Sequence, residues 1–370
     1  MAAAYGLYTH IRANRIRSTF LLIGLFVLVY LMVFAGALFA EGMLADGAPL
    51  EDLIYRAQRD FLYAFPWATV GAAFWVLIAY RFHQSMIDAV TGGREVTREE
   101  QPRLYNLLEN LCISRGIPTP KLKVMEDPAL NAFATGLNRR QYSITVTSGL
   151  LERLDDKEVE AVLGHELTHI RNGDVRMMVI AMVMAGVISF FGEMFFRLFF
   201  QTGGSWRSSR SSRDRKGGGG AAILIAIALV IVAWVLSIVI KFALSRSREY
   251  LADAGSVELT KNPDAMITAL RKIEGRGELP GANSAIMEMC IDNPRSGFVD
   301  LFATHPAVDK RVDALVKFAG GRDPGPIALP APEGSAEEGS EPDQEQPAEE
   351  TPAQNPWLSK QQGPWGQRQD

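Results

Sequence analysis

The pentapeptide His165-Glu166-Leu167-Thr168-His169 places two histidines four positions apart with a glutamate between them. On a helix, positions i and i+4 lie on one face, so both imidazoles can bind one metal ion while Glu166 points beside it. A catalytic zinc ion takes three protein ligands and makes a bound water acidic enough for a nearby carboxylate to deprotonate. The pattern predicts one zinc ion per chain, bound by His165 and His169, with Glu166 as general base. The same five residues also fit a helix with two surface histidines.

A third protein ligand must come from another part of the chain. If the histidine pair binds zinc, the candidates are His305, a carboxylate, or a cysteine such as Cys290. We expect the two remaining histidines, His10 and His83, to lie at membrane interfaces because each flanks an apolar run.

The segment Arg248-Glu249-Tyr250-Leu251-Ala252-Asp253 supplies the favoured carboxylate. Glu249 and Asp253 are four positions apart and share a helix face. Glu249 can bind the metal, and Asp253 can accept a hydrogen bond from the free ring nitrogen of a ligating histidine. Taken alone, the segment also fits a solvated charged helix face; beside the histidine pair we interpret it as part of the metal site.

Four stretches of the chain contain no charged residue: residues 20–40, 61–80, 177–192 and 217–240. A helix of about 20 apolar residues crosses a bilayer core. The sequence therefore predicts about four transmembrane or membrane-embedded helices and excludes a simple soluble enzyme. Residues 41–60 hold five acids against two arginines, whereas basic residues precede the first run and follow the second. This bias places the N-terminus and the region after residue 80 in the cytoplasm, with an uncleaved first helix.

The third and fourth apolar runs are joined by residues 201–220, which are rich in Gly and Ser and carry five basic residues. If this hairpin crosses the membrane, its basic loop lies outside the cell, against the positive-inside rule; the alternatives are a hairpin that enters the membrane from one side only and one that lies at the interface. In every case the chain returns to the side from which it started. The histidine pair and Glu249 are therefore predicted to share one compartment.

The composition excludes two further classes of protein. Two cysteines do not make the disulfide framework of a small secreted domain. The net charge of −4 divides into −7 from residue 321 onward (10 acidic, 3 basic) and +3 for the rest (35 basic, 32 acidic), so there is no basic excess for nucleic-acid binding.

The C-terminal stretch holds 9 of the 19 prolines and few aliphatic residues, which predicts a disordered acidic tail. Its Pro356-Trp357 and Pro364-Trp365 pairs are either solvated or short docking motifs for a partner.

Local patterns predict a helix over residues 99–114, strands over 121–126 and 142–147, and a helix from residue 155 to about 170. We expect five regions along the chain: a two-helix membrane anchor (1–84), a first soluble part with the histidine helix (85–176), a membrane hairpin (177–244), a second soluble part with Glu249 (245–320) and the tail (321–370).

Four blocks in order carry a family resemblance: residues 131–136, 164–170, 248–253 and 304–311. With the apolar runs around them, they resemble the HtpX-type membrane metalloproteases, a group that also includes the CaaX prenyl protease Ste24 and the mitochondrial protease Oma1. The resemblance covers roughly residues 12–318. Ste24 has more membrane helices, so the chain is more similar to HtpX. The basic connector and the acidic tail depart from the family pattern.

The resemblance implies a mainly α-helical integral membrane protein with a gluzincin-like zinc protease domain and a small β-sheet. It implies endoproteolysis of damaged or misassembled membrane proteins in the cell inner membrane, with the protease domain and both termini cytoplasmic. A non-enzymatic membrane scaffold with structural zinc and a prenyl-protein protease are the alternatives; the presence of Glu166 argues against the first, and the helix count argues against the second.

The resemblance also assigns roles to individual residues. His165, His169 and Glu249 would bind zinc, and Glu166 would be the general base. Asn131 would lie on a substrate-aligning edge segment, or simply occupy a turn. His305 would stabilise the developing oxyanion or orient the substrate, or merely pack the start of a helix.

Overall fold

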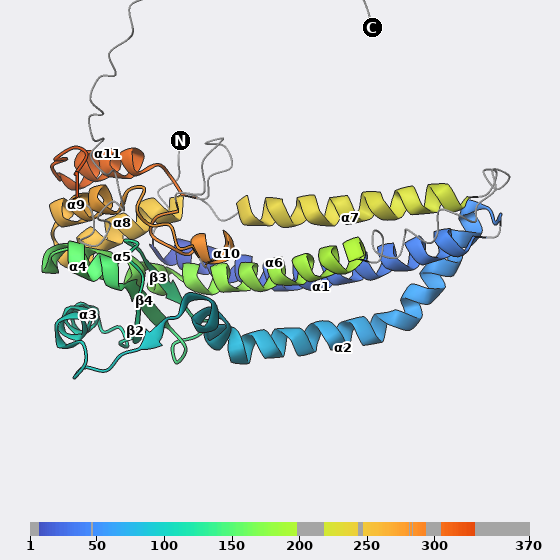
Figure 1. The fold of residues 1–370 in the computed structure, drawn as a ribbon, viewed down its shortest axis with the longest axis horizontal. Helices are drawn as coiled ribbons and strands as arrows, with labels where there is room; N and C mark the ends of the chain where they lie inside the picture. The colour runs from blue at the N-terminus through green and yellow to red at the C-terminus, as the bar shows by residue number, and fades with distance from the viewer. Residues whose placement is uncertain are drawn as a thin grey trace, which may run out of the picture. The chain divides into compact units, whose positions relative to one another are not determined.

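The computed structural model describes residues 7–45, 47–197, 218–242, 247–280, 282, 284–293 and 305–329. Most of these residues are helical, with one small sheet (Figure 1). The predictions for the basic connector (201–217) and for the Pro-Trp tail (330–370) lie outside the described residues.

Four long apolar helices lie together: α1 (Leu7–Leu44), α2 (Leu50–Thr91), α6 (Asp174–Phe196) and α7 (Gly219–Phe242). Helix α1 packs against the other three, and Figure 1 shows all four running side by side. In the described part of the chain, three helical segments are long and apolar enough to cross a membrane: Ile16–Leu44, Leu50–Thr91 and Gly219–Leu236. Helix α6 covers the third apolar run of the sequence.

Helix α2 extends beyond the predicted end of the anchor at residue 84 and continues to Thr91, where Gly92 ends it with a positive φ of 71°. Polar contacts with the sheet hold this extension. Asp88 pairs with the buried Lys123 at 2.6 Å, and Gln84 donates to Thr135 at 2.9 Å. The second membrane helix is therefore continuous with the folded domain.

The sheet has the strand order β1-β2-β4-β3, with β2 and β4 parallel and the outer pairs antiparallel. Its strands are β1 (Arg94–Glu95), β2 (Lys121–Met125), β3 (Ala132–Thr135) and β4 (Ser143–Thr147). Strands β2 and β4 match the predicted strands over residues 121–126 and 142–147. Strand β3 lies at one edge of the sheet and directly follows Asn131.

Seven helices among the described residues complete the folded domain: α3 (Pro102–Arg115), α4 (Ser148–Arg153), α5 (Asp156–Asn172), α8 (Ser247–Thr260), α9 (Pro263–Ile273), α10 (Ser284–Met287) and α11 (Val308–Ala319). Helix α5 packs on β3, helices α3, α8 and α9 pack on α5, and α11 packs on α8 and α9. Helix α5 begins at a capping box, in which Asp155 accepts from the Glu158 backbone and Glu158 accepts from the Asp155 backbone. Acids in its first turn also suit the helix dipole.

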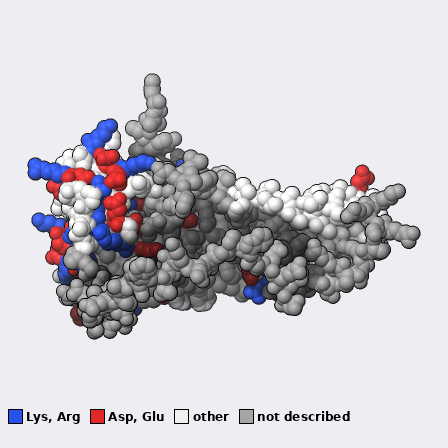
Figure 2. Space-filling model, turned by 45° about the horizontal axis from the view of Figure 1, so that its top comes forward, with Lys and Arg blue, Asp and Glu red and all other residues white. Residues whose placement is uncertain are grey.

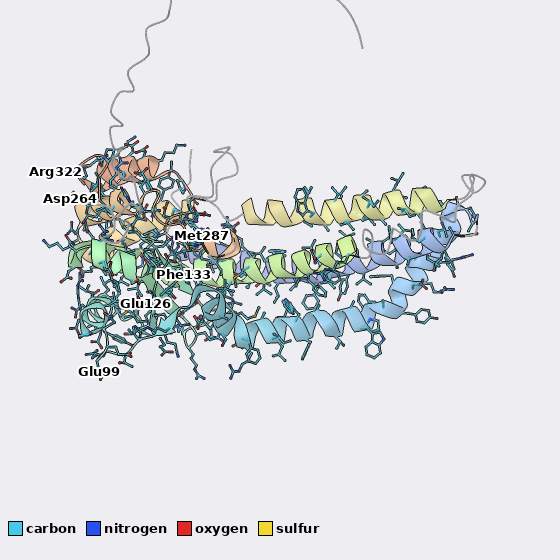
Figure 3. The ribbon with its side chains drawn as sticks, in the orientation of Figure 1. Glu99, Glu126, Phe133, Asp264, Met287 and Arg322 are labelled. Carbon is cyan, nitrogen blue, oxygen red and sulfur yellow. The ribbon has the colours of Figure 1, made fainter. Side chains whose placement is uncertain are left out.

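Two apolar clusters hold the folded domain together. The larger joins α3, α5, α9 and α11 to the sheet through residues such as Leu108, Ile144 and Leu163, which are all fully buried. The smaller contains Phe133 of β3 and Met287 of α10, both labelled in Figure 3. Because α5 lies inside the larger cluster, most of its residues are buried, including both histidines.

Charge separates the folded domain from the apolar helices. On the face shown in Figure 2, the described charged side chains gather over the end formed by α8, α9 and α11, and the described surface of α7 is mainly uncharged.

Past α11, the chain remains on the domain as far as Leu329: Asp323 accepts hydrogen bonds from Arg271, and Leu329 packs against the larger cluster. The chain is therefore packed on the domain beyond residue 321, where the sequence predicts that the tail begins.

Candidate metal centre

The two histidines of helix α5 point their ring nitrogens at each other. His165 Nε2 and His169 Nε2 lie 3.1 Å apart, and the two rings are 0% and 4% exposed. They face one point because they are one helical turn apart. The helix is fixed in place by its burial in the larger apolar cluster.

Helix α8 carries Glu249 to this point because α5 and α8 pack unusually closely. A Cβ added to Gly255 would lie 2.4 Å from Thr168 Cγ2, so only glycine fits at this crossing. The hydroxyl of the next residue, Ser256, donates to the Ala161 carbonyl at 2.6 Å. These contacts set the separation of the two helices and therefore the position of Glu249.

The Glu249 carboxylate completes a three-residue cluster. Its Oε2 lies 3.6 Å from His165 Nε2, and its Oε1 lies 3.7 Å from His169 Nε2. Ligand atoms of these three residues lie within 4.8 Å of one another. Tetrahedral zinc with bonds of about 2.0–2.1 Å separates its ligand atoms by about 3.3 Å.

A buried oxygen without a hydrogen bond supports the same conclusion. Among the described residues Glu249 Oε2 accepts no hydrogen bond, and Nη1 of the nearby Arg311 lies 3.9 Å away, beyond hydrogen-bond distance. A buried carboxylate oxygen without a hydrogen bond is costly, and a metal ion would satisfy it. Two imidazole nitrogens and one carboxylate oxygen are also a donor set that a divalent metal accepts. The cluster therefore fits a bound metal ion.

Buried charges surround the outer side of His165. Its Nδ1 lies 2.9 Å from Asp253 Oδ1. Arg311 of α11 in turn donates two hydrogen bonds to the Asp253 carboxylate, at 2.9 and 2.6 Å. Burial alone would raise the pKa of Asp253, but Arg311 holds it below its ordinary value. The carboxylate therefore stays charged and orients the His165 ring.

His169 has a corresponding partner that the sequence reasoning missed. Its Nδ1 lies 2.9 Å from Oδ2 of Asp174, a fully buried residue in the first turn of α6. Gly173 ends α5 with a φ of 78°, and this turn brings Asp174 back beside the ring. A signal was present in the sequence, since Asn172-Gly173-Asp174 follows the histidine helix directly, and glycine commonly ends helices.

Burial and neighbouring charges shift the protonation of the site. Complete burial raises the pKa of Glu166, against the opposing effect of both histidines. Burial would also raise the pKa of Glu249, but His305 and the ligand histidines hold it well below its ordinary value. For His165 burial lowers the pKa, yet Asp253 and Glu249 outweigh it and raise the value to about 9. The buried carboxyl of Glu166, with its raised pKa beside a Glu249 carboxylate whose pKa is lowered, is a group suited to exchanging a proton.

The structure brings His305 to the metal cluster. Its Nδ1 lies 3.4 Å from Glu249 Oε2, and its Nε2 lies 3.2 Å from the Glu288 carbonyl oxygen. His305 precedes α11 and is 8% exposed. It therefore contacts the third candidate ligand rather than replacing it.

Asn131 directly precedes the edge strand β3, as expected, and its side chain is engaged inside the fold. The amide nitrogen donates to the carbonyl oxygens of Gly277 and Asp292, at 2.6 and 2.9 Å. Part of the strand edge is also occupied, because the Ile291 amide donates to the Ala132 carbonyl at 3.0 Å. A role for Asn131 in binding substrate stays a prediction.

Two other residues considered in the sequence analysis, Cys290 and His83, make their contacts elsewhere in the fold. Cys290 Sγ contacts the Ile286 carbonyl at 3.4 Å, and Cys290 is not joined to Cys112 by a disulfide. His83 is buried in α2 beyond its apolar run and contacts the Ala79 carbonyl at 3.0 Å.

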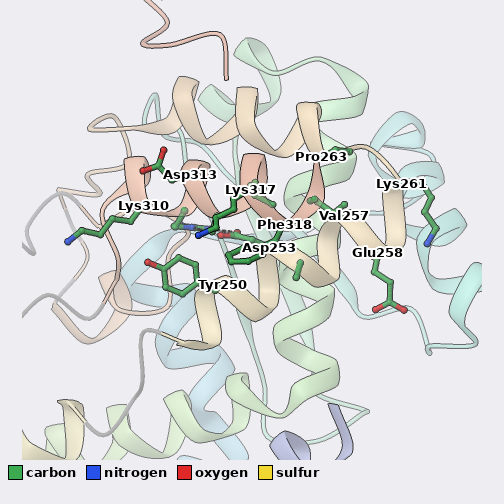
Figure 4. A pocket seen from close by; sticks show the side chains of 15 residues that line it. Tyr250, Asp253, Val257, Glu258, Lys261, Pro263, Lys310, Asp313, Lys317 and Phe318 are labelled. Carbon is green, nitrogen blue, oxygen red and sulfur yellow. Dashed lines mark hydrogen bonds and ion pairs between the residues drawn. The ribbon is translucent and has the colours of Figure 1, made fainter. Parts of the chain in front are cut away.

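A groove of ≈ 790 Å³ lies between α8 and α11 (Figure 4). Asp253, Arg311, Tyr250, Lys310 and Phe318 are among the residues that line it. None of the three candidate metal ligands lines this groove. It therefore adjoins the Asp253–Arg311 pair, on the outer side of the site.

Known protein families and proteins are similar to this chain over the region that contains the cluster. The family model described as peptidase family M48 matches residues 98–319. A curated "Protease HtpX homolog" of Bacteroides fragilis (strain YCH46) is 37% identical over 328 residues, which cover 85% of this chain and 99% of the relative. One of the same name from Listeria monocytogenes serotype 4a (strain HCC23) is 37% identical over 319 residues, covering 84% of this chain and 99% of the relative.

Among solved structures, the crystal structure of S. mikatae Ste24p aligns with a TM-score of 0.42 and 18% identity. The alignment covers 68% of this chain and 58% of that chain.

Proposed function

Because the chain belongs to peptidase family M48 and is a metalloprotease, we propose that it is a zinc-dependent endopeptidase of the membrane that cleaves damaged or misassembled membrane proteins on the cytoplasmic side. The observation that carries the proposal is the buried cluster of His165, His169 and Glu249, whose ligand atoms lie within 4.8 Å of one another. In this proposal these three residues hold one zinc ion per chain. Asp253 orients His165 across a contact of 2.9 Å.

The chain's own residues would supply the proton transfers. When bound, zinc would polarise the scissile carbonyl and make a water molecule acidic. Glu166 lies on the same helix turn as the ligand histidines, and its raised pKa suits it to take a proton from that water. The same carboxyl then returns the proton to the leaving amine. No serine or cysteine nucleophile is required, because the water attacks directly.

His305 is proposed to act on the substrate side of the cluster. Its ring contacts Glu249, and this contact supports a place for it beside the carbonyl oxygen that gains negative charge. A ring N–H placed there would stabilise that charge. Asn131 is proposed to act at a distance, by holding the segments that contain Gly277 and Asp292 against the start of β3.

The place of the site relative to the membrane helices supports substrates of the same membrane. Asn14, two residues before the apolar span Ile16–Leu44, contacts Asp174, and Asp174 contacts His169. The cluster therefore adjoins the end of a membrane helix. The acidic loop between α1 and α2, compared with the basic flanks, supports placing this end in the cytoplasm of a cell with the chain in its inner membrane. This placement is compatible with the role in membrane protein quality control that we propose.

The experiment compares wild type with Glu166→Gln, both purified as full chains in detergent. We expect the variant to retain zinc and its thermal stability but to lose cleavage of an unfolded protein such as casein and of a destabilised membrane protein. Glu160→Gln is the matched control, because Glu160 lies on the same helix but is no part of the cluster. Normal cleavage by Glu166→Gln would refute the assignment of the base, and a wild-type protein that holds zinc without any cleavage would favour the scaffold alternative.

A further inference from the structure

The polar side chain of Asn14 is buried at the end of the first membrane helix. Asn14 is 1% exposed and lies in α1, two residues before the apolar span begins. Its amide nitrogen donates to Asp174 Oδ1 at 2.6 Å and to the Asn172 carbonyl oxygen at 3.2 Å. Burying an amide is costly unless it is hydrogen-bonded, and both of these bonds cross to a segment nearly 160 positions away.

The acceptor of the shorter bond is the carboxylate that contacts a candidate metal ligand. Asp174 uses Oδ1 for Asn14 and Oδ2 for His169 Nδ1, which lies 2.9 Å away. A carboxylate that accepts from the outer nitrogen of a ligating histidine fixes the tautomer and orientation of its ring. Asn14 fixes that carboxylate in turn, and its bond to the Asn172 carbonyl holds the turn on which Asp174 stands.

The helix that carries Asn14 is packed rigidly against the segment that it contacts. Leu21, two turns further along α1, packs against Met177 and Ala181 of α6. Ser18 lies between Asn14 and Leu21 on the same side of α1 and is 1% exposed. The amide is therefore held in place by apolar contacts within the membrane helices.

We infer that Asn14 is a positioning residue for the metal centre: through Asp174 it orients His169, so the first membrane helix forms part of the support of the zinc site. This inference rests on the proposed function, since it assumes that His169 binds zinc. It goes further in stating that the metal affinity depends on the contact between α1 and α6. A displacement of α1 along α6 would move Asp174 and turn the His169 ring away from the metal.

The test measures zinc affinity by competition with a chromogenic chelator, using the full chain in detergent with Glu166→Gln in every protein to prevent self-cleavage. Asn14→Leu keeps the number and branching of the side-chain heavy atoms but removes the donor, and we expect zinc binding weaker by on the order of tenfold. Ser18→Ala is the matched control, because Ser18 is equally buried, lies one turn away, and its hydroxyl has no hydrogen-bond partner among the residues that the structure describes. The control should bind zinc as the parent does.

A second pair of variants separates positioning from a merely structural role. Asn14→Asp sets two carboxylates against each other and should weaken zinc binding, whereas Asn14→Asp combined with Asp174→Asn restores an amide–carboxylate pair and should recover part of the affinity. Cobalt substituted for zinc should show an altered visible absorption spectrum in Asn14→Leu and an unaltered one in Ser18→Ala, because the spectrum reports ligand geometry.

The inference is overturned if Asn14→Leu binds zinc like the parent, if its cobalt spectrum is unchanged, or if the double variant recovers nothing. If the Glu166→Gln parent itself binds no zinc, the proposed function fails. The inference then fails with it, and the two failures are distinguishable because the parent still carries Asn14.

Discussion

Replacing Gly255 by alanine tests whether the close crossing of α5 and α8 builds the metal centre. The added Cβ would lie 2.4 Å from Thr168 Cγ2, 2.5 Å from its Oγ1 and 2.9 Å from its Cβ. Carbon atoms in contact normally lie about 3.5–4.0 Å apart, so the overlap exceeds about 1 Å. Thr168 cannot rotate without cost, because its hydroxyl donates to the Gly164 carbonyl at 2.8 Å. The two helices must therefore separate.

The size of the effect follows from the precision that a metal site requires. An overpacked core costs about 1–3 kcal/mol. Glu249 lies in the same helix as Gly255, so a displacement of α8 carries it away from both histidines, and ligand distances tolerate only about 0.2 Å. We expect zinc binding to weaken by about 10- to 100-fold, which corresponds to about 1.4–2.8 kcal/mol.

The assay is zinc competition with a chelator, together with thermal unfolding. Gly36→Ala is the control, because Gly36 is also helical but a Cβ there meets nothing within 4 Å. Combining Gly255→Ala with Thr168→Ala removes two of the three clashing atoms and should restore part of the affinity. The reasoning is refuted if Gly255→Ala binds zinc like wild type, or if Gly36→Ala weakens binding to the same extent.

Three further outcomes are expected. Glu249→Ala should lose zinc, as measured by metal analysis of the purified chain, and zinc retained at the wild-type level would contradict its assignment as a ligand. Asp253→Asn keeps the shape of the side chain but removes the charge beside His165, so zinc affinity measured by chelator competition should fall by about 10- to 100-fold, and an unchanged value would exclude this role. Arg271→Leu removes bonds to Asp323 and should lower the melting temperature while leaving zinc affinity unaltered, since Arg271 is no part of the metal cluster; a loss of zinc would show that the two regions are coupled.

The sequence predicted best those elements whose pattern involves only a few neighbouring residues. The histidine helix, its start near Asp155 and the two strands over residues 121–126 and 142–147 follow from spacing and capping rules that act within a few residues. Glu249 was also a predictable candidate, because its i,i+4 relation to Asp253 matches that of the histidine pair.

Contacts across long chain distances could not be predicted from one sequence. Asp174 was missed because it reaches His169 only through the left-handed turn at Gly173. Asn14 lies in a basic segment that resembled a simple membrane anchor, and its role depends on the packing of α1 against α6. The extension of α2 to Thr91 was missed for a similar reason, since apolar content ends before the helix does.

The central claim is that one zinc ion is bound jointly by two helices. Diffraction from crystals of the Glu166→Gln chain, recorded on both sides of the zinc absorption edge, tests this claim most directly. We predict a single anomalous peak about 2.0–2.2 Å from His165 Nε2, His169 Nε2 and a Glu249 oxygen. A peak bonded to the histidines but not to Glu249, or none at this cluster in a zinc-loaded crystal, would contradict the account.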